Sequence, residues 1–378
     1  MLRTIGFCAL VLVTAFLLVV TVASFTSAND WWIRLWDYPR LAIFTVAGIC
    51  TLVAGFTLHG KRRLIVGGVL VAVTLWQGYR IHRYTLLAKP EVQFIEADAE
   101  VSAKHCFTAL SLNVLQDNRD YGRTLELIRR TDPDMVMLLE TDQAWVDALK
   151  PESARYPHVR EVPIPNRYGL VFMTRLKTDE LTVHRLIEND IPSIFARMRT
   201  PSGRRFGYIG LHPRPPQSGT DTQERDAEIA VGARTAAKSG LPMLAMGDFN
   251  DVAWSDTSEL FKRVGTYLDP RIGRGFYATF PANIPAFRWP LDQIYFTEQF
   301  SIDSLRVLGK TGSDHLPILA KICLVPRIGE QLNEEPETIE RDDIRETDHI
   351  IDKGVRTEAR EEATGTTDGE REKHGESE

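Results

Sequence analysis

The sequence predicts an α/β (α+β) fold preceded by about three transmembrane helices. The first 80 residues contain three long apolar runs. Residues 105–326 alternate between short apolar segments typical of strands and amphipathic segments typical of helices. From Arg327 onward charged residues dominate, which is typical of a solvated chain. We therefore expect a membrane region (1–88), a linker (89–104), a folded domain (105–326) and a disordered acidic tail (327–378).

The three apolar runs span residues 5–25, 41–58 and 64–79. Each is uncharged or nearly so, and each is close to the length needed to cross a bilayer as a helix. The alternative is one cleaved signal peptide followed by buried core helices. No amphipathic segment lies nearby to bury such apolar helices, so we favour three spans.

Basic residues indicate the orientation of these spans. Lys61-Arg62-Arg63 lies in the tight link between the second and third runs, and such loops prefer the cytoplasm. After an odd number of spans the folded domain would lie outside. Arg80, Arg83 and Lys89 argue the other way, but long domains translocate largely regardless of charge. We expect a multi-pass protein of the cell (inner) membrane with an extracytoplasmic domain.

Four aromatic residues, Trp31, Trp32, Trp36 and Tyr38, lie between the first two runs. Aromatic residues are enriched where a protein meets the membrane surface. We interpret these four as an aromatic belt at the outer surface. A rim that contacts substrate is the alternative.

Charge distribution argues against a dedicated duplex-DNA binder. Residues 90–326 contain 28 Lys and Arg against 31 Asp and Glu, whereas phosphate contacts usually require a basic excess. The tail contains 8 basic and 18 acidic residues. We expect no chemistry there, and a short helix over 348–355 is its one candidate element.

The four cysteines form no metal-binding spacing. Cys8 and Cys50 lie in apolar runs, where they act as small hydrophobic residues. Cys106 and Cys323 lie in the first and last predicted strands of the folded domain. A disulfide between them is the alternative if those strands are neighbours. We expect two unlinked buried thiols.

Several elements of the folded domain follow from local pattern. Helices are predicted over 124–130, 222–238 with a cap near Gly240, and 257–264. Strands are predicted over 169–174 and 194–199, with Gly203 in a hairpin turn. Pattern alone indicates mixed α and β structure, for which two packed sheets covered by helices are a suitable arrangement.

Polar groups recur where predicted strands end or begin. In Leu244–Asn250, a short apolar strand ends with Asp248 and Asn250, which point to the same side because they are two residues apart. Similar positions recur in chain order at Asn113, Glu140, His212, Asp292, Asp314 and His315. A single polar strand end is ordinary, but this ordered set has the types that bind metals and transfer protons.

Together these segments resemble the endonuclease/exonuclease/phosphatase superfamily over about residues 105–325. The sequences G-D-F-N at 247–250 and S-D-H-L-P at 313–317, in this order, carry the resemblance. It implies a four-layer α/β/β/α sandwich and a metal-dependent phosphoric ester hydrolase. The three-span layout also resembles bacterial envelope-linked members of this superfamily, such as the VanJ-like proteins.

The resemblance assigns a role to each candidate residue. Glu140 would be the principal Mg²⁺ ligand, with Asn113 beside it and Asp314 completing the shell; Mn²⁺ is the alternative ion. Asp248 would orient or deprotonate the attacking water.

Three further residues would act on the phosphate itself. Asn250 would hold a phosphate oxygen, and His212 would be a second phosphate contact. His315, held by Asp292, would carry charge against the phosphate or transfer a proton.

Three residues leave questions open. Many relatives have Asp-His at the strand of Asp292, whereas this chain has Asp292-Gln293, so substrate contacts near Gln293 are expected to differ. Arg214 and Arg225 would either reach a substrate phosphate or be surface charges.

We therefore predict a membrane-anchored Mg²⁺-dependent phosphoesterase that hydrolyses a phosphate ester or pyrophosphate of a lipid or small molecule. Its expected partners are the lipid bilayer and that phosphorylated substrate, with no protein partner. A membrane-tethered nuclease acting on nucleic acid is the alternative, although it is not favoured. An inactive binding or scaffold copy of the fold is the third reading.

Overall fold

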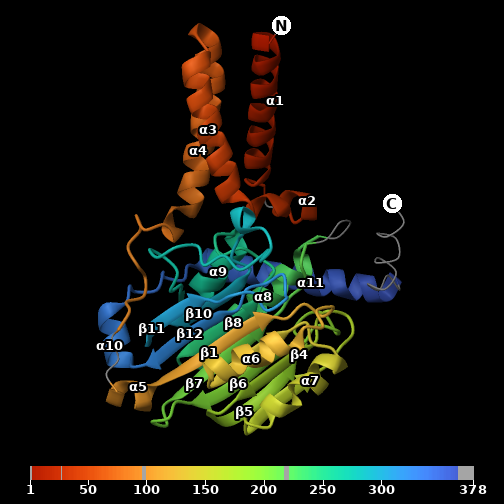
Figure 1. Cartoon of the computed structure of the whole chain (residues 1–378), viewed down its shortest axis with the longest axis vertical. Coiled ribbons are helices and arrows are strands. Elements are labelled where there is room, and N and C mark those ends of the chain that lie inside the picture. The colour runs from red at the N-terminus through yellow and green to blue at the C-terminus, as the bar shows by residue number, and fades with distance from the viewer. Residues whose placement is uncertain (1, 27, 96–98, 217–220, 365–378) are drawn as a thin grey trace.

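The computed structural model describes residues 2–26, 28–95, 99–216 and 221–364. Two six-stranded sheets face each other, with helices on their outer sides (Figure 1). The first sheet has the strand order β11-β12-β1-β2-β4-β3, and the second has β5-β6-β7-β8-β10-β9. The four-layer α/β/β/α sandwich predicted above is confirmed.

The strands are bounded as follows. The first sheet contains β1 (Cys106–Asn113), β2 (Met135–Leu139), β3 (His158–Val162), β4 (Leu170–Thr174), β11 (Phe300–Val307) and β12 (Ile318–Leu324). The second contains β5 (Lys177–His184), β6 (Ser193–Arg199), β7 (Arg205–Leu211), β8 (Met243–Asp248), β9 (Tyr267–Leu268) and β10 (Asp292–Thr297). Each sheet holds one parallel pair, β1–β2 and β7–β8, among antiparallel neighbours.

The main core lies between the two sheets. Phe107 of β1 stacks on Phe206 of β7 at 5.0 Å, and Phe172 of β4 stacks on Tyr208 of β7 at 5.1 Å. Central strands such as β2 are buried at every residue, because one face meets the other sheet and the other face meets helices.

Four helices cover the outer faces. Helices α6 (Tyr121–Thr131) and α7 (Gln143–Ser153) pack on the first sheet, and α8 (Gln223–Ser239) and α9 (Asp256–Gly265) pack on the second. The predicted helices are confirmed to within a few residues. Gly240 ends α8 with a φ of 65°, the left-handed conformation that glycine adopts at no steric cost. The sequence analysis did not predict α7.

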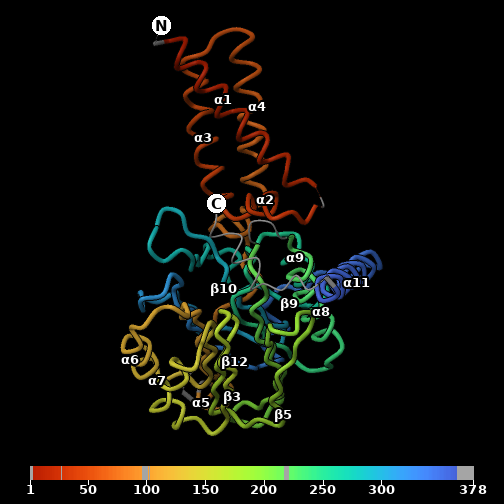
Figure 2. Tube along the Cα trace, turned by 90° about the vertical axis from the view of Figure 1, so that its right-hand side faces the viewer, coloured from red at the N-terminus to blue at the C-terminus, as the bar shows by residue number. Residues whose placement is uncertain are grey.

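Helices α1 (Leu2–Ala23), α3 (Arg40–Thr57) and α4 (Gly60–Ile81) extend away from the sheets as a bundle (Figures 1 and 2). All three are long and apolar enough to cross a membrane. A polar chain joins them: Arg40 donates to Gln77 at 3.1 Å, and Gln77 donates to Thr21 at 3.0 Å. The short elements α2 (Trp31–Arg34) and η1 (Leu35–Asp37) lead from α1 towards α3, and η2 (His82–Tyr84) follows α4.

The predicted linker is wrong for residues 89–95, which belong to the folded domain. Val92 is fully buried in the core between the sheets. Glu91 is buried and accepts a hydrogen bond from the amide of Asp269 at 2.8 Å, and it pairs with Arg83. The segment is thus held by one buried apolar residue and one buried acidic residue. Two such residues are too few to produce a periodic pattern in the sequence. Helix α5 (Ala99–His105) then leads into β1.

The disordered tail is also wrong as far as residue 364. Helices α10 (Pro326–Leu332) and α11 (Arg341–Thr364) occupy this segment, and α11 packs on α8. Its buried positions, Asp343, Thr347, Ile351 and Gly354, recur every three or four residues. Because Ile351 is the one large hydrophobic residue among these four, composition conceals the stripe. Residues 365–378 of the predicted tail lie outside the described residues.

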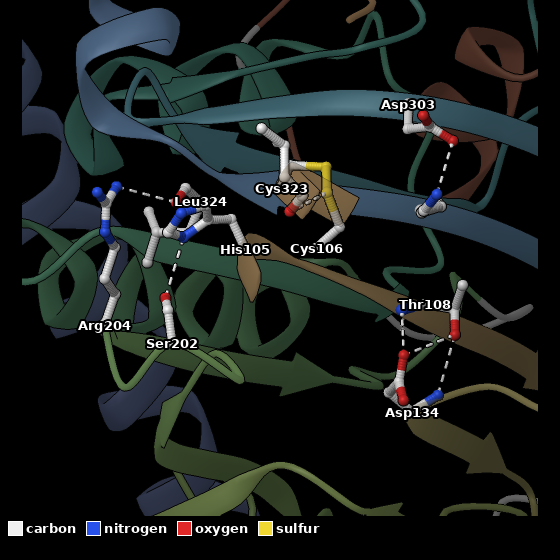
Figure 3. The surroundings of a disulfide bond; sticks show 11 residues. His105, Cys106, Thr108, Asp134, Ser202, Arg204, Asp303, Cys323 and Leu324 are labelled. Carbon is white, nitrogen blue, oxygen red and sulfur yellow. Dashed lines mark hydrogen bonds and ion pairs between the residues drawn. A yellow bond between two sulfur atoms is a disulfide. The ribbon is translucent and has the colours of Figure 1, made fainter. Parts of the chain in front are cut away.

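Two cysteines expected as unlinked thiols form a disulfide, so that prediction is wrong. Strands β1 and β12 are antiparallel neighbours with Cys106 opposite Cys323, and the two sulfurs are bonded (Figure 3). Local sequence could not establish that strands 217 residues apart are partners. Nearby, Asp134 accepts hydrogen bonds from the amide and hydroxyl of Thr108 at 2.8 and 2.9 Å, which ties β1 to the turn before β2.

Candidate active site

The predicted site residues meet at one edge of the sandwich because of how the strands run. Asn113 ends β1 and Glu140 follows β2, which are parallel neighbours in the first sheet. His212 follows β7 and Asp248 ends β8, the parallel pair of the second sheet. Asp292 begins β10 directly opposite Asp248 in the antiparallel register. The site therefore straddles both sheets.

Asn113 links the two sheets at this edge. Its Nδ2 donates to Glu140 Oε1 at 2.8 Å and to Asp248 Oδ2 at 3.1 Å. Its Oδ1 accepts from the amide of Leu115 at 3.0 Å. In this orientation Asn113 is a bridge between two carboxylates, and its side-chain oxygen faces its own turn.

Glu140 has an unusual backbone conformation, with a φ of 59°. Non-glycine residues in this region are uncommon and cluster at functional sites. Its Oε2 accepts from the amide of Gln116 at 3.1 Å. Burial raises the pKa of Glu140; the bonds from Asn113 and Gln116 lower it, and the charge of Asp248 raises it again.

A divalent cation fits this arrangement. Two largely buried carboxylates, Glu140 and Asp248, share one neutral amide donor between them. Burial makes negative charge costly at this edge, and a bound cation would offset that cost. Carboxylate oxygens are the ligands that Mg²⁺ and Mn²⁺ prefer.

His315 lies between two acids. Its Nδ1 is 2.8 Å from Asp292 Oδ2, and its Nε2 is 3.5 Å from Asp248 Oδ2. Burial alone would lower the pKa of His315, but Asp292 and Asp248 raise it to about 10. The imidazole is therefore protonated at neutral pH. Ser313 positions the segment by donating to the Asn113 carbonyl at 2.7 Å and accepting from the His315 amide at 3.0 Å.

His212 is in the opposite charge state. It is buried, and its Nε2 is 3.9 Å from Asp248 Oδ2. Burial lowers the pKa of His212 to about 4, so the ring is neutral at neutral pH. One charged and one neutral imidazole thus flank the same carboxylate.

The turn after β8 places Asn250. Gly247 has a φ of 144°, and a Cβ there would lie 2.0 Å from the carbonyl oxygen of Leu211, so only glycine fits. Asn250 itself has a φ of 47°. Its amide donates to Asp248 Oδ1 at 2.9 Å, and its Nδ2 donates to the Pro213 carbonyl at 2.9 Å.

The structure thus brings together seven of the eight predicted residues: Asn113, Glu140, His212, Asp248, Asn250, Asp292 and His315. Among the described residues, the metal-binding atoms of Asp248, Asp292 and His315 lie within 4.8 Å of one another. Asp314 is half-buried, and its carboxylate accepts from Ser313 at 3.4 Å rather than joining Glu140. Its role as a metal ligand stays a prediction.

Three neighbouring residues play roles that the sequence analysis did not assign. Gln293 is buried, donates to the Asp251 carbonyl at 2.7 Å and accepts from Arg271 at 2.6 Å, so its side chain braces the neighbouring loop. Arg214 pairs with Glu188, and Arg225 pairs with Asp226. Both arginines are buried, so neither is a surface charge.

A residue between the first two long apolar helices, α1 and α3, also reaches the site. Tyr38 is buried, and its hydroxyl donates to the carbonyl of Asn250 at 2.6 Å. Arg225 donates to the same carbonyl at 3.0 Å. Tyr38 is therefore not part of an exposed aromatic belt. No local signal indicates this contact, because the two residues are 212 positions apart.

Replacing Tyr38 with Phe is expected to lower kcat about fivefold to tenfold without unfolding the protein. The change removes one buried hydrogen bond, which is worth about 1 kcal/mol, from the carbonyl that fixes the Asn250 turn. Tyr156→Phe is the matched control, because Tyr156 is equally buried and donates to the Pro133 carbonyl at 2.9 Å, away from the site. Equal kcat values in the two variants would contradict the positioning role.

Comparison with known proteins agrees with this architecture. The family model described as the Endonuclease/Exonuclease/phosphatase family matches residues 110–315. No curated protein matches the chain. The human nocturnin catalytic domain with bound sulfate has a TM-score of 0.50 and 16% identity, covering 63% of this chain and 99% of that one. This likeness shows the fold.

Two bacterial structures were also matched. An endonuclease/exonuclease/phosphatase from Bacteroides vulgatus has a TM-score of 0.49 and 18% identity, covering 58% of this chain and 100% of that one. A mannosyl-6-phosphatase from Bacteroides thetaiotaomicron has a TM-score of 0.45 and 16% identity, covering 57% and 99%.

Proposed function

Because the chain belongs to the Endonuclease/Exonuclease/phosphatase family, whose members are hydrolytic phosphoesterases, we propose that it is a membrane-anchored phosphoesterase that uses a divalent cation. The observation that carries this proposal is the convergence of Glu140, Asp248 and His315 at one edge of the sandwich. The ion would be Mg²⁺, with Mn²⁺ as the alternative.

Each residue then has a chemical role. The cation, held by Glu140 with Asn113 beside it, would neutralise charge that develops on the phosphate. Asp248 accepts a proton from the attacking water or orients it. The cationic ring of His315, held by Asp292, binds a phosphate oxygen or protonates the leaving oxygen.

Two more residues would complete the phosphate site. Asn250 would contact a non-bridging phosphate oxygen, and neutral His212 would donate a second hydrogen bond. Asp314, next to His315 in the chain, would complete the metal shell. These assignments rest on the resemblance and on the positions described above.

Two features support an extracytoplasmic domain on the cell (inner) membrane. The Cys106–Cys323 disulfide suits an oxidising compartment, because such bonds are rare in the cytosol. Lys61-Arg62-Arg63, at the start of α4 and at the opposite end of the bundle from the sheets, suits the cytoplasmic side. The substrate would be a phosphate ester or pyrophosphate of a lipid or small molecule, because the domain lacks the basic excess of a nucleic-acid binder.

The test is a product-release screen with the full-length protein in detergent. Substrates would be phosphatidic acid, a polyprenyl pyrophosphate, bis(p-nitrophenyl) phosphate, and single-stranded and duplex DNA, each with Mg²⁺ and with chelator. We expect metal-dependent hydrolysis of a lipid or small-molecule phosphate. Preferential cleavage of DNA would favour the nuclease, and no hydrolysis of any substrate would favour the inactive copy.

Glu140→Gln is expected to raise the Mg²⁺ concentration for half-maximal activity about tenfold to a hundredfold, because it removes the principal ligand charge. The matched control is Glu126→Gln on the exposed face of α6. A titration of activity against Mg²⁺ measures the effect. An unchanged midpoint in the Glu140 variant would reject the proposed metal site.

A further inference from the structure

One short stretch of the folded domain exposes large apolar side chains. Among the described residues from 105 to 325, the large hydrophobic residues that are exposed are Ile284 and Phe287, at 52% and 53%. Isolated exposed hydrophobic residues are ordinary. These two, however, lie on the same loop between β9 and β10, and that loop borders the active site.

The loop is a hairpin, which we call the apolar hairpin (residues 280–289). Phe280 and Trp289 exchange backbone hydrogen bonds at 3.2 and 2.7 Å, and the 3₁₀ turn η3 (Pro285–Phe287) lies at the tip. At the base, the Phe280 ring lies 4.7 Å from the His315 ring. Trp289 lies 6.0 Å from Tyr38. The base therefore touches both the site and the membrane region.

The hairpin lies at the foot of the transmembrane bundle. Figure 2 shows the β9–β10 loop, in teal, rising to the lower end of the helices. Figure 1 also shows this loop directly below the bundle. Tyr38, which meets its base, is two residues before α3 begins.

Other exposed apolar residues surround the foot of the bundle. Leu86 and Leu87, just after η2, are 81% and 94% exposed. They lie near the β9–β10 loop, because Gly273 donates to the Arg83 carbonyl at 2.8 Å. Trp32 on α2 is 51% exposed. Thus three separate segments present apolar side chains where the spans leave the folded domain.

We propose that the apolar hairpin contacts lipid: Ile284 and Phe287 insert into the interfacial layer of the bilayer that the three spans cross, with Leu86, Leu87 and Trp32 around the same foot. Because Phe280 connects the hairpin to His315, the substrate phosphate reaches the site from the lipid surface beside the hairpin. This inference rests on the anchoring part of the proposed function and defines its substrate as a membrane amphiphile.

The first test measures insertion and does not depend on activity. In a Cys8→Ser, Cys50→Ser background, Phe287→Cys is labelled with an environment-sensitive fluorophore and placed in phosphatidylcholine nanodiscs, one copy per disc. The matched control is Val355→Cys on α11, where the native residue is 49% exposed. We expect a blue shift and quenching by brominated lipid at position 287 but not at 355. Equal emission and quenching at the two positions would overturn the proposal.

The second test asks whether insertion serves the reaction. The variant Ile284→Ser with Phe287→Ser is compared with Ile344→Ser and Val355→Ser, whose native residues are similarly exposed. With dioleoyl phosphatidic acid in nanodiscs, kcat/KM is expected to fall about tenfold or more in the hairpin variant only. With soluble dihexanoyl phosphatidic acid it is expected to stay unchanged.

These outcomes separate the inference from the proposed function. Equal losses on both substrates would show that the hairpin acts on the site itself and would overturn lipid delivery. If the native protein hydrolyses neither lipid, the choice of phosphatidic acid fails, while the fluorescence at position 287 still decides whether the hairpin inserts.

Discussion

Replacing Asp292 with Asn is expected to reduce kcat by about two to four orders of magnitude, the range lost with a positioned acid or base. Asp292 holds Nδ1 of His315 and contributes the largest share of the charge that raises its pKa. Without that charge the pKa of His315 falls, because burial lowers it and only the more distant carboxylates, such as Asp248, still raise it. A smaller share of the rings would then carry the proton that the proposed role of His315 requires.

The pH profile provides a sharper measurement than the rate alone. A group that must be protonated loses activity as pH rises through its pKa. The native protein should therefore remain active to about pH 9, because the pKa of His315 is raised to about 10. In Asp292→Asn the alkaline limb should move to lower pH, so the deficit grows from pH 6 to pH 9. Asp147→Asn, on the exposed surface of α7, is the control. A uniform deficit at every pH would contradict the assigned role.

Removing the disulfide is expected to produce the largest change in stability. Cys106→Ser with Cys323→Ser should lower the free energy of unfolding by about 2–5 kcal/mol, because the bond restricts the unfolded chain over a separation of 217 residues. For a domain of this size the unfolding midpoint would fall by about 5–15 °C.

The matched control for this experiment is Cys8→Ser with Cys50→Ser, because both of these cysteines are free. Thermal unfolding in detergent, followed at one heating rate, measures both pairs. A similar midpoint for the two double variants would show that the β1–β12 pairing does not need the covalent link.

The sequence predicted much of the site because its chemistry is carried by short local patterns. Asp248 and Asn250 share a strand end, and Gly247 is explained by the approach of the Leu211 carbonyl. The remaining members could be ordered along the chain by resemblance. Their mutual distances, however, depend on strand pairing, and the bridging role of Asn113 became apparent only from the two-sheet arrangement.

The wrong predictions have two physical causes, which are pairing between distant strands and the burial of polar residues. Cys106 and Cys323 become partners through the β1–β12 register. Helix α11 buries a stripe that includes Asp343 and Thr347, so its polar composition resembled disorder. Tyr38 has the composition of a membrane-surface residue, yet its hydroxyl is used inside the protein. Hydropathy depends on the residue type alone, so it does not indicate which residues are in contact in the folded protein.

The contacts between the N-terminal helical bundle and the folded domain fix where the candidate site lies relative to the bundle. Tyr38 donates to Asn250, Trp254 donates to the Asp37 carbonyl at 2.8 Å, and Tyr84 donates to the Ala253 carbonyl at 2.8 Å. These bonds join the helical bundle directly to the folded domain, so a flexible linker does not separate the two. With the spans in a bilayer, the candidate site would lie at a fixed distance from the membrane surface. Its encounters with a lipid substrate would then be governed by two-dimensional diffusion within the adjacent leaflet.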